Sequence, residues 1–162
     1  MTAFACGSDR SPTDTAPLPA VTTAAAAGDV PTNIVSNADI RATKPQTPQR
    51  TIMTWAQAVQ FGDVTAVRES YTERVRKTVP RARLEDAAGR IGSLLGHPQI
   101  VATFMRGPDL ALARVGLVSY AAGGRSSTQP TTFRLRRENG RWLLDDARLL
   151  LDTAAALRRV TP

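Results

Sequence analysis

The 162-residue chain has a single cysteine, Cys6, and a single histidine, His97. One cysteine cannot form a disulfide within the chain, so packing and hydrogen bonds must hold the fold together. Zinc and most transition metals are bound by clusters of cysteine and histidine, so no metal site is predicted. No glycine-rich phosphate loop and no nucleophile elbow is present, and no cofactor is predicted. His97 precedes Pro98 and is typical of a helix end rather than of a general base.

Long apolar runs and lysines are also scarce. No window approaches the roughly 18 apolar residues that a membrane-spanning helix requires. Lys44 and Lys77 are the only lysines, so the formal net charge of +7 comes almost wholly from arginine. The arginines are spread through the chain and are not interleaved with aromatic residues as in a stacking platform for bases. A solvated basic surface is therefore favoured over weak binding of nucleic acid or another anionic polymer. For such binding the basic cluster would be Arg74, Arg76, Lys77, Arg81 and Arg83.

The first ten residues, MTAFACGSDR, resemble the cleavage end of a bacterial lipoprotein signal peptide. In such a signal, small apolar residues lead to a cysteine that is lipidated and becomes the mature N-terminus. Residues 1–6 would be the remnant of a signal that ends at Cys6, and the true start of the gene would lie upstream. This interpretation implies a lipid-anchored domain in the cell envelope. The alternative is a free cysteine in the tail of a cytoplasmic protein.

Residues 7–48 predict a disordered linker, because they contain six prolines and no aromatic residue. Such a segment cannot bury enough apolar surface to offset the entropy lost on ordering. A polar tether behind a lipidated cysteine would hold a domain away from a membrane, so the two N-terminal features support each other. The domain itself is expected over residues 49–160.

Three helices are expected in the first half of this domain. Apolar residues at helical spacing predict the first over residues 51–61. Gly62 suits its C-terminal end, and Asp63 is a suitable N-cap for a second helix over residues 64–71. Pro80 would open the third helix at its first turn.

From residue 99 the pattern changes to strands. The first is expected over residues 100–105, and the second over residues 110–120. The second strand is apolar on both faces and is therefore placed in the centre of the sheet. Residues 122–130 are expected to form a loop, and residues 152–159 a short helix capped by Asp152.

Residues 131–151 predict a β-hairpin that turns at Asn139-Gly140. A type I′ turn needs a positive φ at both central residues, which asparagine and glycine tolerate best. Counting outward from the turn pairs Leu135 with Leu144. One face of the hairpin is then apolar and should cover the core, with Phe133, Leu135, Trp142 and Leu144. The other face is mixed and carries Arg134, Arg136, Leu143 and Asp145. On this face Arg134 and Asp145 are expected to form a cross-strand ion pair.

Asp146 falls on the apolar face in this register, opposite Phe133. A carboxylate there must be paired, protonated or solvated. It could lie in water or pair with Arg148. It could instead line a pocket, where burial would raise its pKa and make it a candidate acid or base. A bulge of one residue would exchange Asp146 for Asp145.

The order of these elements resembles the nuclear transport factor two-like superfamily, which includes the SnoaL-like and ketosteroid-isomerase-like proteins. Two motifs carry the resemblance, WAQAV at residues 55–59 with Gly62-Asp63 after it, and RENGRWLLD at residues 137–145. The resemblance implies an α+β domain, in which N-terminal helices pack on a curved four-stranded antiparallel sheet. Sheet and helices would form a cone with an internal pocket. Members of the superfamily bind ligands, pair with other chains, or carry out acid–base chemistry on carbonyl compounds.

We therefore expect a non-catalytic envelope lipoprotein domain that binds a small apolar ligand or a protein partner. The alternative is an isomerase- or dehydratase-like enzyme, with Asp146 as base and Tyr71 as a hydrogen-bond donor. The expected pocket is walled by Trp55, Phe104, Trp142 and Asp146. A homodimer through the open face of the sheet, around Arg134 and Arg136, is a further expectation.

Overall fold

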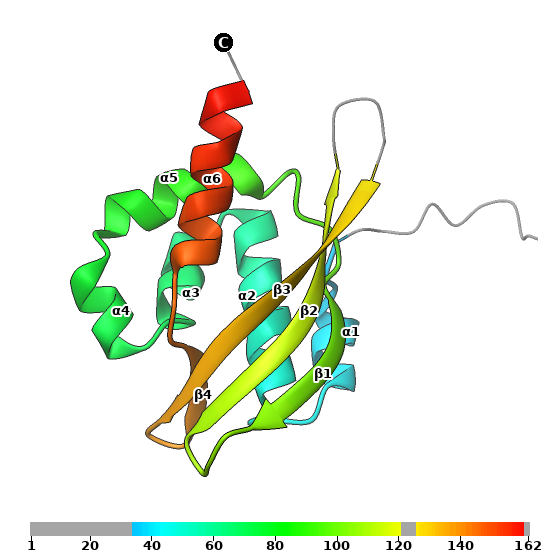
Figure 1. The fold of residues 1–162 in the computed structure, drawn as a ribbon, viewed down its shortest axis with the longest axis vertical. Helices are drawn as coiled ribbons and strands as arrows, with labels where there is room; N and C mark the ends of the chain where they lie inside the picture. The colour runs from blue at the N-terminus through cyan, green and yellow to red at the C-terminus, as the bar shows by residue number, and fades with distance from the viewer. Residues whose placement is uncertain (1–33, 121–125, 161–162) are drawn as a thin grey trace, which may run out of the picture. The chain divides into compact units, whose positions relative to one another are not determined.

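The computed structural model of the protein describes residues 34–120 and 126–160. These residues form six helices and one four-stranded antiparallel sheet of order β1-β2-β3-β4 (Figure 1). The expected α+β class and the central position of the second strand are confirmed. The strands are β1 (Gln99–Met105), β2 (Leu110–Tyr120), β3 (Ser126–Glu138) and β4 (Arg141–Leu144). The helices are α1 (Asn37–Ala42), α2 (Pro48–Phe61), α3 (Val64–Glu69), α4 (Glu73–Thr78), α5 (Arg81–Ile91) and α6 (Arg148–Val160).

Helix α2 lies against one face of the sheet, and its own sequence fixes both of its ends. At its start, the Thr47 side chain accepts a hydrogen bond from the Arg50 N–H. At its end, Gly62 adopts a left-handed conformation with φ 67°. The Asp63 side chain then accepts from the Ala66 N–H and starts α3. The predicted roles of Gly62 and Asp63 are confirmed.

The folded domain begins before residue 49. Helix α1 lies inside the predicted linker and is started by a reciprocal capping box between Ser36 and Asp39. Val35 is fully buried in the core. The linker prediction is therefore wrong for these residues, because one buried valine and a capped turn anchor the segment to α2. The earlier part of the predicted linker and Cys6 lie outside the described residues.

Helix α4 was also not expected from the apolar pattern. The second helix ends at Glu69 rather than at residue 71, because the chain then forms a short parallel bridge with β4. In this bridge the Leu144 N–H donates to the Ser70 carbonyl at 2.8 Å, and the Thr72 N–H donates to the Leu144 carbonyl at 2.9 Å. Thr72 then caps α4. The bridge places residues 70–72 alongside the end of the hairpin.

The register of the last hairpin is as predicted. Leu135 lies opposite Leu144, and Arg137 lies opposite Trp142. The two turn residues have positive φ angles, 50° at Asn139 and 78° at Gly140. The turn chemistry therefore sets which face of β3 and β4 is buried.

The hairpin differs from the prediction at its two ends. Strand β3 contains Pro130, which was expected in a loop. Strand β4 pairs only with residues 135–138 of β3, so at Pro130 one side of β3 has no partner strand. Proline is accepted at such an edge, because its missing N–H is not needed for pairing there. At the other end, α6 starts at Arg148 rather than near Asp152, because the Asp146 side chain accepts a hydrogen bond from the Arg148 N–H at 2.8 Å.

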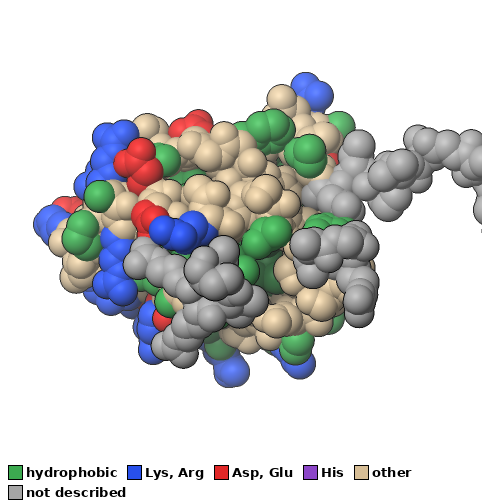
Figure 2. Space-filling model, turned by 90° about the horizontal axis from the view of Figure 1, so that it is seen from above, with side chains coloured by type: hydrophobic (Ala, Val, Ile, Leu, Met, Phe, Trp, Pro, Cys, Tyr) green, Lys and Arg blue, Asp and Glu red, His purple; other side chains and the backbone are tan. Residues whose placement is uncertain are grey.

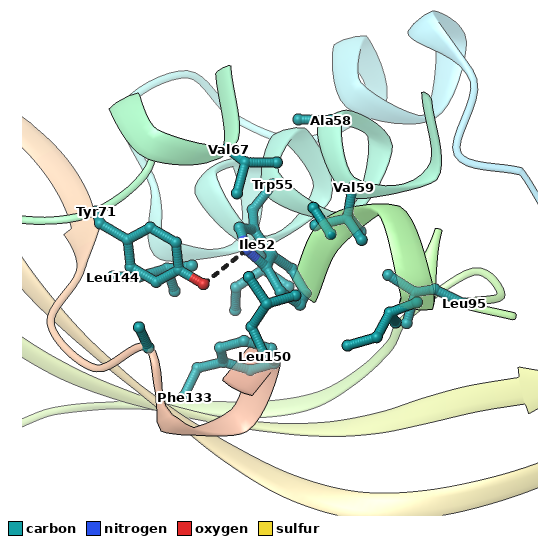
Figure 3. Packing of buried hydrophobic residues seen from close by; sticks show 14 of the residues in the cluster. Ile52, Trp55, Ala58, Val59, Val67, Tyr71, Leu95, Phe133, Leu144 and Leu150 are labelled. Atoms are coloured by element: carbon teal, nitrogen blue, oxygen red, sulfur yellow. Dashed lines mark hydrogen bonds between the residues drawn. The ribbon is translucent and has the colours of Figure 1, made fainter. Parts of the chain in front are cut away.

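Trp55 of α2 is at the centre of the buried core (Figure 3). Its ring packs edge-to-face on Phe133 of β3, with a centroid distance of 5.2 Å. Its indole Nε1 donates a hydrogen bond to the Tyr71 hydroxyl at 3.1 Å. Burial raises the pKa of the Tyr71 hydroxyl far above its ordinary value. Leu150 of α6 packs into the same core, so the C-terminal helix belongs to the domain.

Helices α5 and α2 approach each other closely at Gly92, the residue that ends α5. A Cβ atom at position 92 would lie 2.6 Å from the carbonyl oxygen of Val59 in α2. Gly89, about one turn earlier, has open space where a Cβ would be. The two glycines therefore differ in what a methyl group would meet.

We expect Gly92→Ala to lower the free energy of unfolding by about 1–3 kcal/mol, because α5 must move away from α2. Gly89→Ala is the matched control and should raise the free energy of unfolding by about 0.5–1 kcal/mol, since alanine is the better helix former. Urea denaturation of the two variants measures the difference. A Gly92→Ala variant as stable as Gly89→Ala would contradict the close approach of the helices.

Candidate functional site

Asp145 is the one acidic side chain among the described residues that is buried, with 1% of its surface exposed. It directly follows β4, and its backbone N–H donates to the Arg134 carbonyl at 2.8 Å. The predicted ion pair is confirmed, since the Arg134 Nε lies 3.3 Å from the Asp145 Oδ2. A buried carboxylate needs such partners, because its desolvation is costly.

Asp145 has three further side-chain partners. The Thr72 hydroxyl donates to Oδ1 at 3.2 Å, and a terminal nitrogen of Arg74 donates to the same oxygen at 3.1 Å. Arg74 also donates to the Asp145 backbone carbonyl. The Arg136 Nε lies 3.5 Å from Oδ2. The carboxylate therefore joins α4, the segment before α4 and strand β3.

A cavity of about 600 Å³ opens beside Asp145, between α4, β3 and the start of α6. We call it the arginine cavity. Its charged lining consists of Arg74, Arg134, Arg136, Arg148, Asp145 and Asp146. Apolar side chains complete the wall, among them Val75, Val79 and Leu151. Its guanidinium groups can hold an anion.

Asp146 lies at the edge of the arginine cavity and is paired with Arg148. The closest distance between the two side chains is 2.7 Å. The hydrogen bond from the Arg148 side chain lowers the pKa of Asp146 below its ordinary value. Of the alternatives left open by the sequence, pairing with Arg148 is confirmed, and a raised pKa is contradicted, because a cation lies beside the carboxylate. Asp146 is therefore ionised at neutral pH and is a weak base.

A second cavity, of about 640 Å³, lies between helix α6, the C-terminal end of α5, the end of β2 and the start of β3. We call it the apolar cavity. Its apolar lining is Trp55, Ile91, Leu94, Leu95, Leu117, Val118, Leu149, Leu150, Ala156 and Leu157. Polar groups also line it, including Ser119, Ser127, Gln129, Asp152 and Thr153. Such a lining, apolar with a few polar groups, is typical of small-molecule sites.

The four predicted pocket residues do not share a cavity. Trp55 lines the apolar cavity, Asp146 lines the arginine cavity, and Trp142 lines a smaller hollow of about 210 Å³. Phe104 is half-exposed on the opposite face of the sheet from Phe133, because it pairs with Leu112. A register shift between Ile100 and Ala102 moves the later side chains of β1 to the other face.

Tyr71 is fully buried and lines neither cavity. Its hydroxyl accepts the hydrogen bond from Trp55, which holds it in the core. The predicted enzyme pair of Asp146 and Tyr71 is therefore not brought together around a space for substrate. No group of three His, Cys, Asp or Glu side chains that could hold a metal ion is present among residues 34–120 and 126–160.

The predicted basic cluster is divided by the fold. Arg74 lines the arginine cavity, while Lys77 pairs with Glu73 one helical turn earlier, at 2.7 Å. Arg76, Arg81 and Arg83 do not line this cavity. Figure 2 shows basic side chains along the edge of the domain on the side of α4, with acidic side chains between them. The hairpin pattern did point to Arg134 and Arg136, but nothing local in the sequence pointed to Thr72.

Comparison of the sequence with models of protein families and with curated proteins gives no match. Solved structures do match. A SEC-C motif containing protein from Rhodopseudomonas palustris is 12% identical with a TM-score of 0.53, and the match covers 65% of this chain and 80% of that chain. A SEC-C motif containing protein from Psychrobacter arcticus is 11% identical with a TM-score of 0.53, covering 64% of this chain and 61% of that chain. A ketosteroid isomerase-like protein from Erwinia carotovora atroseptica is 17% identical with a TM-score of 0.41, and the match covers 59% of this chain and 86% of that chain.

The domain has the nuclear transport factor two-like fold, with helices followed by a four-stranded antiparallel sheet. The resemblance expected from the two sequence motifs is confirmed at the level of the fold. At identities of 11% and 12% the similarity shows the fold alone, and no activity or ligand follows from it. Within the residues that the structure describes, no helix is both long enough and apolar enough to span a bilayer.

We expect the carboxyl of Asp146 to titrate below the ordinary range of an aspartate, because Arg148 stabilises its charged form. Its stabilising contribution should be present above the pKa of the unfolded chain and should be lost as the pH falls through the lower folded pKa. Arg148→Gln should raise the pKa towards its ordinary value. The carboxyl ¹³C chemical shift measured against pH reports both values.

Arg90→Gln is the control for this titration, since Arg90 pairs with Asp86 on α5. It should leave the pKa of Asp146 unchanged. An Asp146 that titrates in the ordinary range in the unmodified chain, or that does not respond to Arg148→Gln, would contradict the pairing.

Proposed function

We propose that this domain binds a small apolar molecule in the apolar cavity and does not act as an enzyme. The observation that carries the proposal is the cavity itself, since its volume of about 640 Å³ suits a small molecule and its wall is mostly aliphatic. Burying an apolar ligand there would gain about 25 cal/mol for each Å² removed from water. The few polar side chains of its lining could fix the orientation of such a ligand.

Two observations favour binding over the isomerase- or dehydratase-like alternative. The lowered pKa of Asp146 makes it a poor base, and Tyr71 is closed off from both cavities. Asp152 is the carboxylate that lines the apolar cavity. It lies near the start of α6 and is exposed to solvent. The other polar groups of that lining, among them Ser119, Tyr120 and Gln129, are neutral, and Asp152 is its one carboxylate.

We further propose that the chain is a lipoprotein of the cell envelope, with Cys6 as the lipidated residue. The support is the short stretch of mainly small or apolar residues that ends at Ala5-Cys6, and the proline-rich segment that follows it. A tether of that composition would let the domain take up a ligand near a membrane. Metabolic labelling with a fatty-acid analogue, compared between the gene with its upstream region and a Cys6→Ala variant, tests this part. Labelling that persists without Cys6 would refute it.

Pairing with a protein, or with a second copy of the chain, is the other form that the proposal can take. Phe104 lies half-exposed on the sheet face that also carries Arg134 and Arg136. Leu112 of β2 lies between Phe104 and Arg134, and exposed aromatic and arginine residues on one face are a common composition for an interface. Sedimentation of the full chain over a range of concentrations distinguishes a dimer from a monomer.

We expect the chain to bind an uncharged apolar dye such as Nile red, and Ala156→Phe to weaken that binding by about tenfold or more. Ala156 lines the apolar cavity from an exposed position on α6, so a phenyl ring there would occupy the space of a ligand without disturbing the core. Saturation at about 100 times Kd should raise the free energy of unfolding by about 2.7 kcal/mol. Dye fluorescence and thermal denaturation measure the two effects.

Ala155→Phe is the matched control, because Ala155 is exposed on the same helix and does not line the cavity. It adds the same ring to the surface and should leave dye binding unchanged. Equal loss in both variants, or no binding by the unmodified chain, would overturn the apolar site. Native mass spectrometry of the chain purified from cells would then identify a natural ligand by its extra mass.

A further inference from the structure

We propose that the arginine cavity is a binding site for a doubly charged oxyanion, a phosphate group carried by a small molecule or a lipid headgroup. The site is separate from the apolar cavity and independent of the proposed function. Three guanidinium groups, those of Arg74, Arg134 and Arg136, converge on the single carboxylate of Asp145.

The charges in this cluster do not balance. Asp145 supplies one negative charge against three positive charges, which leaves a surplus of two. The remaining charged pair in the lining, Arg148 and Asp146, neutralises itself. Asp146 also interacts electrostatically with Arg74, but among the described residues no carboxylate other than Asp145 forms an ion pair with Arg74, Arg134 or Arg136. A phosphate monoester carries close to two negative charges at neutral pH and would match the surplus.

The geometry leaves donors available. The ion pairs of Arg134 and Arg136 with Asp145 are formed through Nε, at 3.3 and 3.5 Å. A guanidinium carries five N–H donors, more than one shared carboxylate oxygen can accept. The side chains of Arg74, Arg134 and Arg136 are 64%, 52% and 45% exposed, whereas that of Asp145 is 2% exposed. Asp145 thus holds three guanidinium groups that all line the cavity. Planar forks of this kind bind phosphate with two hydrogen bonds each.

The cavity has room for more than the phosphate itself. Its volume is about 600 Å³, and Val79 and Leu151 form an apolar part of its wall. A phosphate monoester with a short organic part fits this combination better than a bare chloride or a single carboxylate. Crowding three guanidiniums in one place is unfavourable for the free protein, and a bound dianion would relieve that repulsion.

The test is titration of the full 162-residue chain with inorganic phosphate and with glycerol 3-phosphate by calorimetry at low salt. We expect saturable binding that weakens as salt is added. Arg134→Gln and Arg136→Gln should each weaken binding by about tenfold or more, since each removes charge-assisted hydrogen bonds. In either variant Asp145 keeps the Thr72 and Arg74 hydrogen bonds, so the hairpin retains its anchor. Circular dichroism checks that both variants are folded.

Arg114→Gln is the matched control. Arg114 is exposed on β2 and lies outside the arginine cavity, so this variant loses the same charge from the same sheet. Its phosphate affinity should stay within about twofold of the unmodified chain. Equal weakening in Arg114→Gln would show a non-specific effect of net charge and would overturn the site.

A second arm distinguishes the source of the phosphate. Co-sedimentation with phosphatidylcholine vesicles, with and without phosphatidic acid, asks whether a lipid headgroup is accepted. Binding to phosphatidic acid that is lost in Arg134→Gln and Arg136→Gln, with weak binding of glycerol 3-phosphate, supports a lipid ligand. Binding of glycerol 3-phosphate alone supports a soluble phosphomonoester. Absence of binding in both arms overturns the proposal.

Discussion

The buried carboxylate of Asp145 is the constraint on which the packing of α4 against the β3–β4 hairpin depends. It accepts hydrogen bonds from Thr72 and Arg74 on the helical side and lies within ion-pair distance of Arg134 and Arg136 on β3. An unpaired carboxylate in this position would cost several kcal/mol, so these elements must be in place together. The parallel bridge between Tyr71 and Leu144 brings the two sides into contact. Burial of one acidic group thus couples the hairpin to α4 and holds three arginines in place at the same time.

Helix α6 connects this cluster to the rest of the fold. Leu149 and Leu150 line the apolar cavity, while Arg148 and Leu151 line the arginine cavity. The two spaces therefore share a wall, although one is aliphatic and the other is charged. Trp55 lines the first cavity and not the second, and in the core it packs on Phe133 and donates a hydrogen bond to Tyr71.

What could be predicted from the sequence was local. The Asn139-Gly140 turn fixes the register of its two strands by conformational preference, and the pairing of Arg134 with Asp145 follows by counting. The partners that complete the site are not local, since Arg74 lies 71 residues from Asp145 in the chain. The position of Phe104 could not be obtained from alternation, because one bulge in β1 reverses the face of every later side chain. Apolar cavities are equally hard to read, since a leucine that lines a space has the same pattern as one that fills it.

A purely structural role does not account for the number of arginines around Asp145. One well-placed guanidinium neutralises a buried carboxylate, and Arg74 already contacts both its side chain and its backbone carbonyl. Arg134 and Arg136 add two exposed positive charges nearby, and each repels the others at short range. The side chains of Arg134 and Arg136 are about half exposed, so solvent screens much of this repulsion and the free protein can hold the three guanidiniums together. On the proposal above, a bound dianion would lie among the additional guanidiniums, and Asp145 would orient them as donors for it.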